Sequence, residues 1–370
     1  MSQLESVVPQ TPDVTPASDA AGATAPIHAQ LESAIRVLAI IPGTGKDASF
    51  MFLKRQMQSL ERVGVEVREI YVHSRTSPLY LFRMRKLLTK EISNFRPHVI
   101  HSQYGTVTSL LCCTVGSAPL VITFRGSDLN RHMSVTWLRG QLSILFSQVS
   151  ALRASQIICV SRQLLDRLWW GRHKSIVLPT GVNLDSFCPT SVAEARASLN
   201  WDLTERIVLF CGGTEPDAKG LNLVQAAVRC AETAVGNVRL FVLDGSFPAD
   251  TVPLYLNAAD CLAFASLNEG SPNIVKEALA CNLPIVSVDV GDVRERLEGV
   301  SPSQIVHRDS REFGVALAEI LQTRKRSNGR EKVREFSEDA TAVRLLSLYR
   351  NTLRHDHTLS GTTEKASRFP

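Results

Sequence analysis

The chain has 370 residues, of which 44% are hydrophobic and 21% are charged, a balance typical of folded globular proteins and not of disordered ones. A single hydrophobic core does not usually grow to this size, so we expect two domains. The formal net charge of +5 comes without a dense run of Lys and Arg interleaved with aromatic residues, so nothing here indicates a nucleic acid partner.

The eight cysteines are scattered, and none forms a C-x-x-C pair. This pattern predicts neither a disulfide framework nor a zinc site, and it fits a reducing compartment. The nine histidines include no H-E-x-x-H motif, so we expect no metal. No secretory signal and no apolar run of about 18 residues is visible. The prediction is therefore a cytoplasmic protein, either soluble or held peripherally at the inner face of the plasma membrane.

The first 34 residues contain no Lys or Arg and are rich in Ala, Thr, Pro, Ser and Asp, a composition that predicts a disordered tail over 1–34. From residue 35 onward, short apolar β-type runs alternate with amphipathic segments of helical period, such as 50–63. This alternation predicts βαβ units around a parallel sheet. The expected strands of this first domain, 35–187, are 37–41, 65–71, 99–101, 120–123, 157–160 and 176–178.

A second alternating series follows a polar stretch near residue 187 and defines a second domain, 188–335. A last helix, 336–354, is expected to pack back on the first domain, and 355–370 to form a flexible tail. Two doubly wound α/β domains joined by a hinge place the carboxyl ends of their strands across one cleft, where such folds bind ligands. The expected strands of the second domain are 207–211, 238–243, 261–265 and 285–288, and its expected helices are 221–231, 254–258, 274–280 and 313–321.

The first loop, Ile41 to Lys46, is rich in glycine but matches neither common nucleotide motif. Asp47 stands where a P-loop carries Ser or Thr, and the G-x-G-x-x-G pattern is absent. Gly43 would let the backbone come close to a ligand, and the alternative is a plain turn between strand and helix.

Two further loops follow apolar strands and carry cations. In Thr123 to Asp128, Arg125 stands at the carboxyl end of a strand, where it would pair with phosphate unless the segment is only a capping turn. The other loop leaves its strand through glycines and ends at Lys219, which is expected to open the next helix. A lysine there is unfavourable for the helix dipole unless an anion offsets it, although exposed lysines are common.

The segment 269–277 has the sequence E-G-S-P-N-I-V-K-E, a turn that opens a helix, with one glutamate on either side. Backbone N–H groups at such a helix start hold anions, and ionised carboxylates accept hydrogen bonds from hydroxyl groups. A sugar phosphate offers both kinds of group. The alternative is a capped surface helix with two solvated glutamates, which spacing alone does not exclude.

Together these pieces resemble the retaining GT-B glycosyltransferases of family 4, the glycosyl transferases group 1 type. The similarity runs from about Val37 to Leu353, and the order and spacing of its segments make it specific. It implies two Rossmann-like domains facing across a cleft. It also implies transfer of a sugar from a nucleotide-sugar donor to an acceptor hydroxyl, with retention at the anomeric carbon and without a cofactor. The segments are 97–105, 123–129, 157–161, 178–187, 218–220 and 269–287.

The resemblance also implies parts for residues of the second domain. Glu269 would face hydroxyl groups of the donor sugar, and Glu277 would accept from the ribose of the nucleotide. Lys219 would neutralise the leaving diphosphate, so that no metal is needed. The diphosphate itself would be held by the turn and the helix start: Gly270, Ser271, Pro272, Asn273 and Ile274.

In the first domain, the resemblance places Gly126 and Asp128 around the sugar and Gly43 close to the phosphates. Arg125 stands where the family commonly has a histidine. An arginine there would still stabilise phosphate oxygens in catalysis, but it has no acceptor atom. The arginine that usually precedes the lysine is also missing, and the short stretch between 245 and 260 leaves UDP versus GDP undecided.

Two segments of the first domain, 75–90 and 129–165, contain several Lys and Arg, large apolar residues and no acid. They would suit an anionic membrane surface or a lipid-diphosphate acceptor, and the alternative is ordinary helices that bury their apolar face. The expected acceptor is a growing polysaccharide or a lipid-linked glycan. The competing functions are a GT-B-fold epimerase or phosphorylase, and a non-catalytic nucleotide-sugar-binding subunit, which Arg125 and the missing arginine favour.

Overall fold

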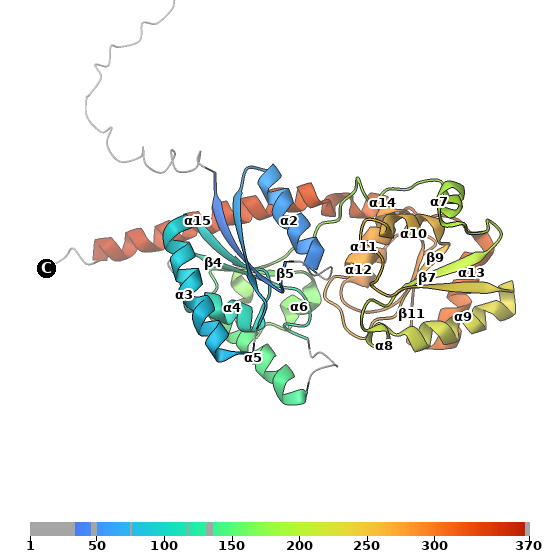
Figure 1. Cartoon of the computed structure of the whole chain (residues 1–370), viewed down its shortest axis with the longest axis horizontal. Helices are drawn as coiled ribbons and strands as arrows, with labels where there is room; N and C mark the ends of the chain where they lie inside the picture. The colour runs from blue at the N-terminus through green and yellow to red at the C-terminus, as the bar shows by residue number, and fades with distance from the viewer. Residues whose placement is uncertain (1–33, 46–49, 75, 117, 131–135, 367–370) are drawn as a thin grey trace, which may run out of the picture. The chain divides into compact units, whose positions relative to one another are not determined.

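The computed structural model describes residues 34–45, 50–74, 76–116, 118–130 and 136–366 (Figure 1). The tail predicted for 1–34 lies outside these residues except for Ala34, and Arg75 of the first basic segment also lies outside them. Within the described chain, strands and helices alternate along almost the whole length.

The first six strands form a parallel sheet with the order β2-β1-β3-β4-β5-β6. Strands β1 and β4 are buried along nearly their whole length, because helices cover both faces of a sheet of this kind. The strands are β1 Arg36–Pro42, β2 Glu66–Val72, β3 Val99–Ser102, β4 Leu120–Phe124, β5 Gln156–Cys159 and β6 Ser175–Val177.

Two groups of helices sandwich this sheet. Helix α2 and the last helix, α15, pack on one face through a core that includes Leu53, Met57 and Leu345, and α3 to α6 cover the other face. The helices are α2 Met51–Arg62, α3 Pro78–Phe95, α4 Thr106–Cys112, α5 Trp137–Arg153, α6 Arg162–Asp166 and α15 Glu338–Ala366, with a 3-10 turn at Arg172–Lys174.

The second sheet is also parallel and has the order β11-β10-β9-β7-β8. Its helices bury their apolar faces in a separate core. The strands are β7 Arg206–Cys211, β8 Val238–Leu243, β9 Cys261–Phe264, β10 Ile285–Val288 and β11 Gln304–Val306. The helices are α7 Val192–Leu199, α8 Pro216–Lys219, α9 Leu221–Val235, α10 Val252–Ala258, α11 Asn273–Ala280, α12 Val293–Leu297, α13 Ser310–Thr323 and α14 Gly329–Val333, followed by a 3-10 turn at Arg334–Phe336.

The predicted fold class is confirmed, because both halves contain a doubly wound parallel sheet. The sequence analysis missed β11, whose three residues are too few to show a period. It also ended the last helix at 354, whereas the structure continues this helix to 366, within the stretch expected to form a tail. Helix α15 continues to Ala366, because no proline interrupts the chain before that point.

Helix α15 is tied to the first sheet by both apolar and polar contacts. His101 of β3 is completely buried, and its ring nitrogens hydrogen-bond Tyr349 Oη at 2.7 Å and Thr123 Oγ1 at 2.8 Å. Burial lowers the pKa of His101 to about 3, so the ring is neutral. At the start of α15, Val182 pairs with the chain around Ser337.

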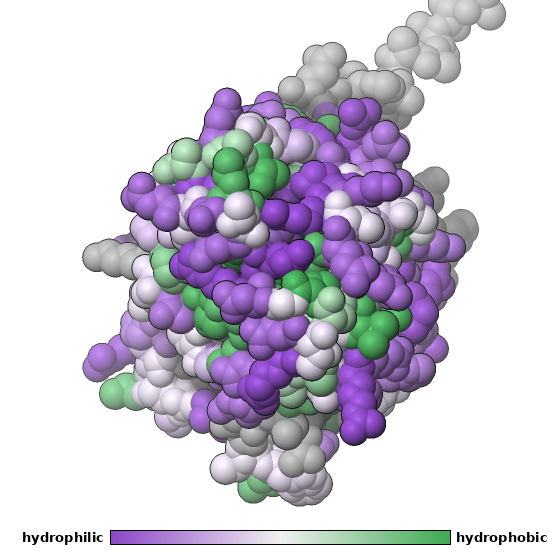
Figure 2. Space-filling view, turned by 90° about the vertical axis from the view of Figure 1, so that its right-hand side faces the viewer, coloured by the Kyte–Doolittle hydropathy of each residue, from purple (hydrophilic) through white to green (hydrophobic). Residues whose placement is uncertain are grey.

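The surface of the second domain is mainly hydrophilic where Figure 2 shows it, on the side of α7, α9 and α13, and apolar residues lie there in separate groups. None of the described helices is long and apolar enough to cross a bilayer. Among the described residues there is also no group of three or more His, Cys, Asp or Glu that could hold a metal ion.

Candidate functional site

The predicted site residues lie on loops that leave the carboxyl ends of the strands. In each sheet the strand order reverses next to the first strand, between β1 and β3 and between β7 and β9. Loops at such a switch point diverge and leave a crevice for a ligand. Gly43 follows β1 and Arg125 follows β4, whereas Lys219 follows β7 and Glu269 follows β9.

Glycines bring the loop after β4 and the loop after β9 into contact. A Cβ on Gly270 would lie 2.2 Å from the carbonyl oxygen of Arg125, and a Cβ on Gly126 would lie 3.2 Å from the amide nitrogen of Gly270. Gly291 has a φ of +63°, and its Cβ would lie 2.7 Å from the carbonyl oxygen of Gly270. Three backbone segments therefore meet at Gly270 with no room for a side chain.

Lys219 and Glu269 form an ion pair, with 2.5 Å between Nζ and Oε1. The two loops that carry them are joined by a hydrogen bond from Leu267 N to Ala218 O at 3.0 Å. They approach closely because Gly220, at a φ of +86°, has no Cβ to meet the carbonyl oxygen of Ala265. The sequence placed Lys219 at a helix start, but the structure places it at the last residue of the one-turn helix α8, where the helix dipole favours a cation.

Glu277 lies in the second turn of α11 and is half-buried. Its carboxylate makes no hydrogen bond or ion pair with the residues that the structure describes. Burial raises the pKa of Glu277, and the positive charges of Arg55 and Lys276 partly offset this effect. Arg55, from α2 of the first domain, was not identified from the sequence because it belongs to no recognisable motif.

The start of helix α11 leaves its backbone N–H groups without a side-chain cap, since the residue before it is Pro272. Asn273 has a buried side-chain oxygen without a hydrogen-bond partner in the described residues. The backbone of Gly270 to Ile274 therefore forms a helix start that can receive an anion.

Behind this helix start lies a buried polar cluster that the sequence analysis missed. Ser271 was expected to face the ligand, but its hydroxyl donates to Asp292 Oδ2 at 2.8 Å and accepts from Lys276 Nζ at 3.2 Å. Lys276 also donates to the carbonyl oxygen of Thr180 at 2.7 Å. Burial lowers the pKa of Lys276 to about 8. No sequence signal distinguishes this lysine from a surface residue of an amphipathic helix.

Asp128 was expected to line the sugar site, and its carboxylate contacts the protein backbone. It is completely buried, and its carboxylate accepts hydrogen bonds from the backbone N–H groups of Gly105, Arg125 and Gly126 at 2.8 to 3.1 Å. Burial raises the pKa of Asp128, and these hydrogen bonds partly offset the shift. The carboxylate thus holds the turn in shape and positions Gly126 against Gly270.

The guanidinium of Arg125 also faces protein. It donates to Gln103 O at 2.9 Å, to Gln103 Oε1 at 2.5 Å, to Thr180 Oγ1 at 2.7 Å and to Gln56 Oε1 at 2.8 Å, and it lies over the ring of Phe52. Burial lowers the pKa of Arg125 to about 10. All these partners are neutral, so none of them neutralises the positive charge of Arg125. The side chain binds residues of the first domain and makes no contact with Glu269.

A second cation lies beside the loop after β9. Arg308, in the loop between β11 and α13, donates to the carbonyl oxygen of Ser266 at 3.3 Å, one residue before the bond that joins Leu267 to Ala218. The sequence analysis noted a missing arginine before Lys219 but did not identify Arg308, which lies 89 positions later in the chain.

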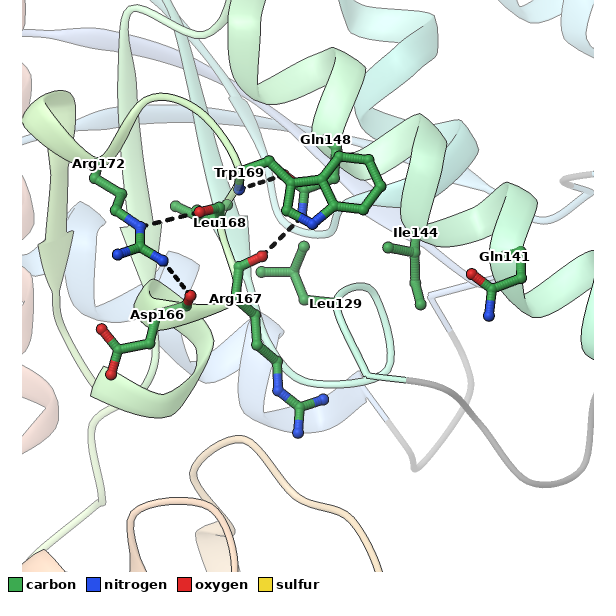
Figure 3. Close-up of a pocket in the computed structure, with 9 residues that line it drawn as sticks. All are labelled: Leu129, Gln141, Ile144, Gln148, Asp166, Arg167, Leu168, Trp169 and Arg172. Carbon is green, nitrogen blue, oxygen red and sulfur yellow. Dashed lines mark hydrogen bonds between the residues drawn. The ribbon is translucent and has the colours of Figure 1, made fainter.

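A groove of about 770 Å³ opens beside the loop after β4 (Figure 3). Arg167 donates to Asn130 Oδ1, and Asn130 Nδ2 donates to the carbonyl oxygen of Glu269 at 3.1 Å. One wall of the groove is therefore tied to the backbone of a predicted donor residue. Figure 3 shows Gln141, Ile144 and Gln148 reaching it from α5, with Leu129, Arg167 and Trp169 from the loops and Asp166, Leu168 and Arg172 at its edge.

Comparison with known proteins identifies the family. Residues 29–186 match Glycosyltransferase Family 4, and residues 206–323 match Glycosyl transferases group 1. A D-inositol 3-phosphate glycosyltransferase of Segniliparus rotundus is 31% identical over 316 residues, which cover 70% of this chain and 67% of the relative. The TuaC protein of Bacillus subtilis, named for teichuronic acid biosynthesis, is 26% identical over 226 residues, covering 56% of this chain and 57% of that protein. The chain thus spans about half to two thirds of the length of these curated relatives.

Solved structures share the fold. A sucrose-phosphate synthase from Thermosynechococcus elongatus superposes with a TM-score of 0.73 at 19% identity, covering 86% of this chain and all of that one. The Anabaena protein HepE, solved in complex with UDP-glucose, gives a TM-score of 0.61 at 15% identity, covering 88% of this chain and 99% of that one. At these identities the structural likeness concerns the fold alone. The sequence matches and the two doubly wound domains together place this chain in glycosyltransferase family 4, of the glycosyl transferases group 1 type, with the GT-B fold.

Proposed function

We propose that this protein transfers a sugar from a UDP- or GDP-sugar to a hydroxyl group of a glycan or lipid-linked acceptor, with retention at the anomeric carbon. One observation carries the proposal: the Lys219–Glu269 ion pair stands on joined loops at the switch point of the second sheet. The segment that follows Glu269 contains the uncapped start of α11 and the carboxylate of Glu277, which has no partner among the described residues. The family membership and the UDP-glucose bound by HepE support a nucleotide-sugar as donor.

An exchange of partners explains how the ion pair would serve donor binding. The Lys219 side chain is 37% exposed, and a pair this exposed contributes only about 0–1 kcal/mol. A diphosphate would draw Lys219 away from Glu269 and form stronger, charge-assisted hydrogen bonds with it. The freed carboxylate of Glu269 could then accept from sugar hydroxyls, while Glu277 accepts from the ribose.

The chemistry would be electrostatic. When the glycosidic bond breaks, negative charge develops on the diphosphate, and groups already aimed at that position lower the barrier. Lys219 and the N–H groups of Gly270 to Ile274 would supply this stabilisation, with Arg308 as the second cation. Because side chains provide the positive charge, we propose that neither a metal nor a cofactor is required. Front-face attack by the acceptor, assisted by the leaving phosphate, would give retention.

Donor binding tests this proposal. With the UDP- or GDP-sugar that binds best in a calorimetric panel, Lys219→Ala and Glu277→Ala should each weaken binding by about 1–3 kcal/mol, because each change removes a charge-assisted hydrogen bond. Lys325→Ala and Glu298→Ala change exposed residues of the same types and should leave the affinity unchanged. Equal affinities in all four variants would contradict the site.

Turnover distinguishes the competing functions. Incubation of the bound donor should release nucleotide slowly without acceptor and faster with glycan or lipid-linked acceptors, and a chelator should not change the rate. Binding without any release would favour the non-catalytic subunit, and an altered sugar still attached to the nucleotide would favour an epimerase.

A further inference from the structure

Helix α5 has the reverse of the usual amphipathic arrangement. The residues that it buries against the first domain are small or polar: Gly140, Ser147, Gln148, Ser150 and Ala151. Most of its large apolar side chains lie on the other side, in solvent, while Ile144 and Phe146 are half-buried. A helix on a water-exposed surface ordinarily turns its apolar face toward the core, so the outer face of α5 is typical of a contact surface.

The exposed side chains form one continuous row. Leu138, Leu142, Leu145, Val149 and Leu152 are spaced by four, three, four and three residues, which places them on one face of the helix. Their exposed fractions range from 38% to 63%, and we call this row the α5 apolar stripe. Trp137, at the first residue of the helix, is 60% exposed. Contiguous exposed apolar surface of this kind marks a protein or membrane contact.

The charged residues of α5 itself all have one sign. Between residues 129 and 165 the chain contains no Asp or Glu, and Arg139 and Arg153 of α5 are both exposed. Helix α3, which packs on the same face of the sheet, adds exposed Arg83, Arg85, Lys86 and Lys90 next to Leu79 and Phe82, which are 60% and 54% exposed. Its one acid, Glu91, is paired with Arg68.

We propose that the α5 apolar stripe docks this protein on an anionic phospholipid bilayer. A second copy of the chain would fit the leucine spacing, but stripe-to-stripe pairing would bring Arg139 and Arg153 against arginines of the partner with no acid between them. Lipid phosphates supply the missing negative charge. Trp137 at the end of the stripe, and Trp169 and Trp170 beside α5, suit the interface, where one part of an indole is apolar and the other is wet.

Docking would also place the groove at the lipid surface. Gln141 and Ile144, in the same turns of the helix as the stripe, line the groove, and another lining residue, Arg167, is hydrogen-bonded through Asn130 to the backbone of Glu269. An acceptor anchored in the bilayer would therefore enter the groove without leaving the membrane. This consequence rests on the proposed function, whereas the docking itself does not.

Vesicle flotation tests the docking and requires no catalytic activity. The full chain should float with vesicles of phosphatidylcholine and phosphatidylglycerol, less at high salt, and not with phosphatidylcholine alone. The double variant Leu142→Ser/Leu145→Ser should lower the partition coefficient about tenfold or more, because two leucines no longer enter the interface. Its matched control is Val315→Ser/Val343→Ser, which changes valines that are 60% and 52% exposed on other helices and should float like the wild type.

The charge is tested separately by Arg139→Glu/Arg153→Glu, which should abolish flotation while the far-UV spectrum and the nucleotide-sugar affinity stay unchanged. Flotation that persists in both the serine and the glutamate variants would overturn the proposal. So would a dimer in sedimentation that the serine variant dissociates, if the wild type does not float. Failure of donor binding with intact flotation would refute the proposed function alone.

Discussion

Three charged side chains, of which Asp128 and Lys276 are buried and Arg125 is half-buried, bind protein groups at the candidate site. Asp128 and Arg125 are three residues apart in the same motif. The carboxylate of Asp128 accepts hydrogen bonds from backbone N–H groups, whereas the guanidinium of Arg125 donates to Gln103, Gln56 and Thr180. Lys276 carries a third charge, between Thr180 and Ser271. We infer that these residues position the loops whose backbones meet at Gly270, so their substitution would act on the site indirectly.

Lys276 gives a pH signature that can be measured. Its pKa is lowered to about 8 by burial, whereas the unfolded value is about 10.4. Between these values the unfolded chain binds more protons, so the free energy of unfolding should rise as the pH rises from about 8 to about 10, by up to about 3 kcal/mol. Lys276→Met should lack this rise in urea titrations at each pH. Lys325→Met, an exposed lysine, should keep it, and equal slopes in all three proteins would contradict the assignment.

Helix α15 begins after the second domain and ends on the first, so its docking joins the two ends of the described fold. Ala342, Leu345 and Tyr349 are completely buried in the core shared with α2, and Tyr349 adds a hydrogen bond to buried His101. The apolar period indicated that this segment is a helix. The polar contact was hidden, since the partner of Tyr349 lies 248 residues away in the sequence.

The packing of α15 can be tested within one helix. Leu345→Ala removes a fully buried side chain and should lower the free energy of unfolding by about 2–5 kcal/mol, because it leaves a cavity. Val343→Ala, two residues earlier and 52% exposed, should change it by about 0.5 kcal/mol or less. Chemical denaturation measures both. If Leu345→Ala lowered the free energy of unfolding as little as Val343→Ala, α15 would contribute little to the stability of the core.

At the scale of the whole molecule, the fold was predictable wherever the pattern of apolar residues is local and repeated. Apolar strands such as β1 and β9 and helices such as α9 follow from period and length alone. The site was predictable to the level of the loops, because motifs such as 269–277 lie at strand ends. The directions in which the side chains of Arg125, Asp128 and Ser271 point were not predictable, since their hydrogen-bond partners come from distant loops. The apolar period of α5 also does not show which face of the helix is turned to solvent. Arg308 was missed because no sequence spacing connects it to Lys219.

The contact at Gly270 is where these distant loops meet, and it gives the sharpest test of the whole arrangement. In Gly270→Ala the new Cβ would lie 2.2 Å from Arg125 O, 2.9 Å from Arg125 C and 3.0 Å from Val160 Cγ2. Two of these neighbours are backbone atoms, so the loops after β4 and β9 must separate. We expect kcat/KM for sugar transfer to fall about tenfold or more, because small displacements of groups around the reacting atoms are costly. The far-UV spectrum should stay that of the wild type, because Gly270 lies in a loop outside the strands and helices. Gly116→Ala, where a Cβ meets nothing within 4 Å, should retain full activity. An active Gly270→Ala variant would show that catalysis does not require these loops to touch.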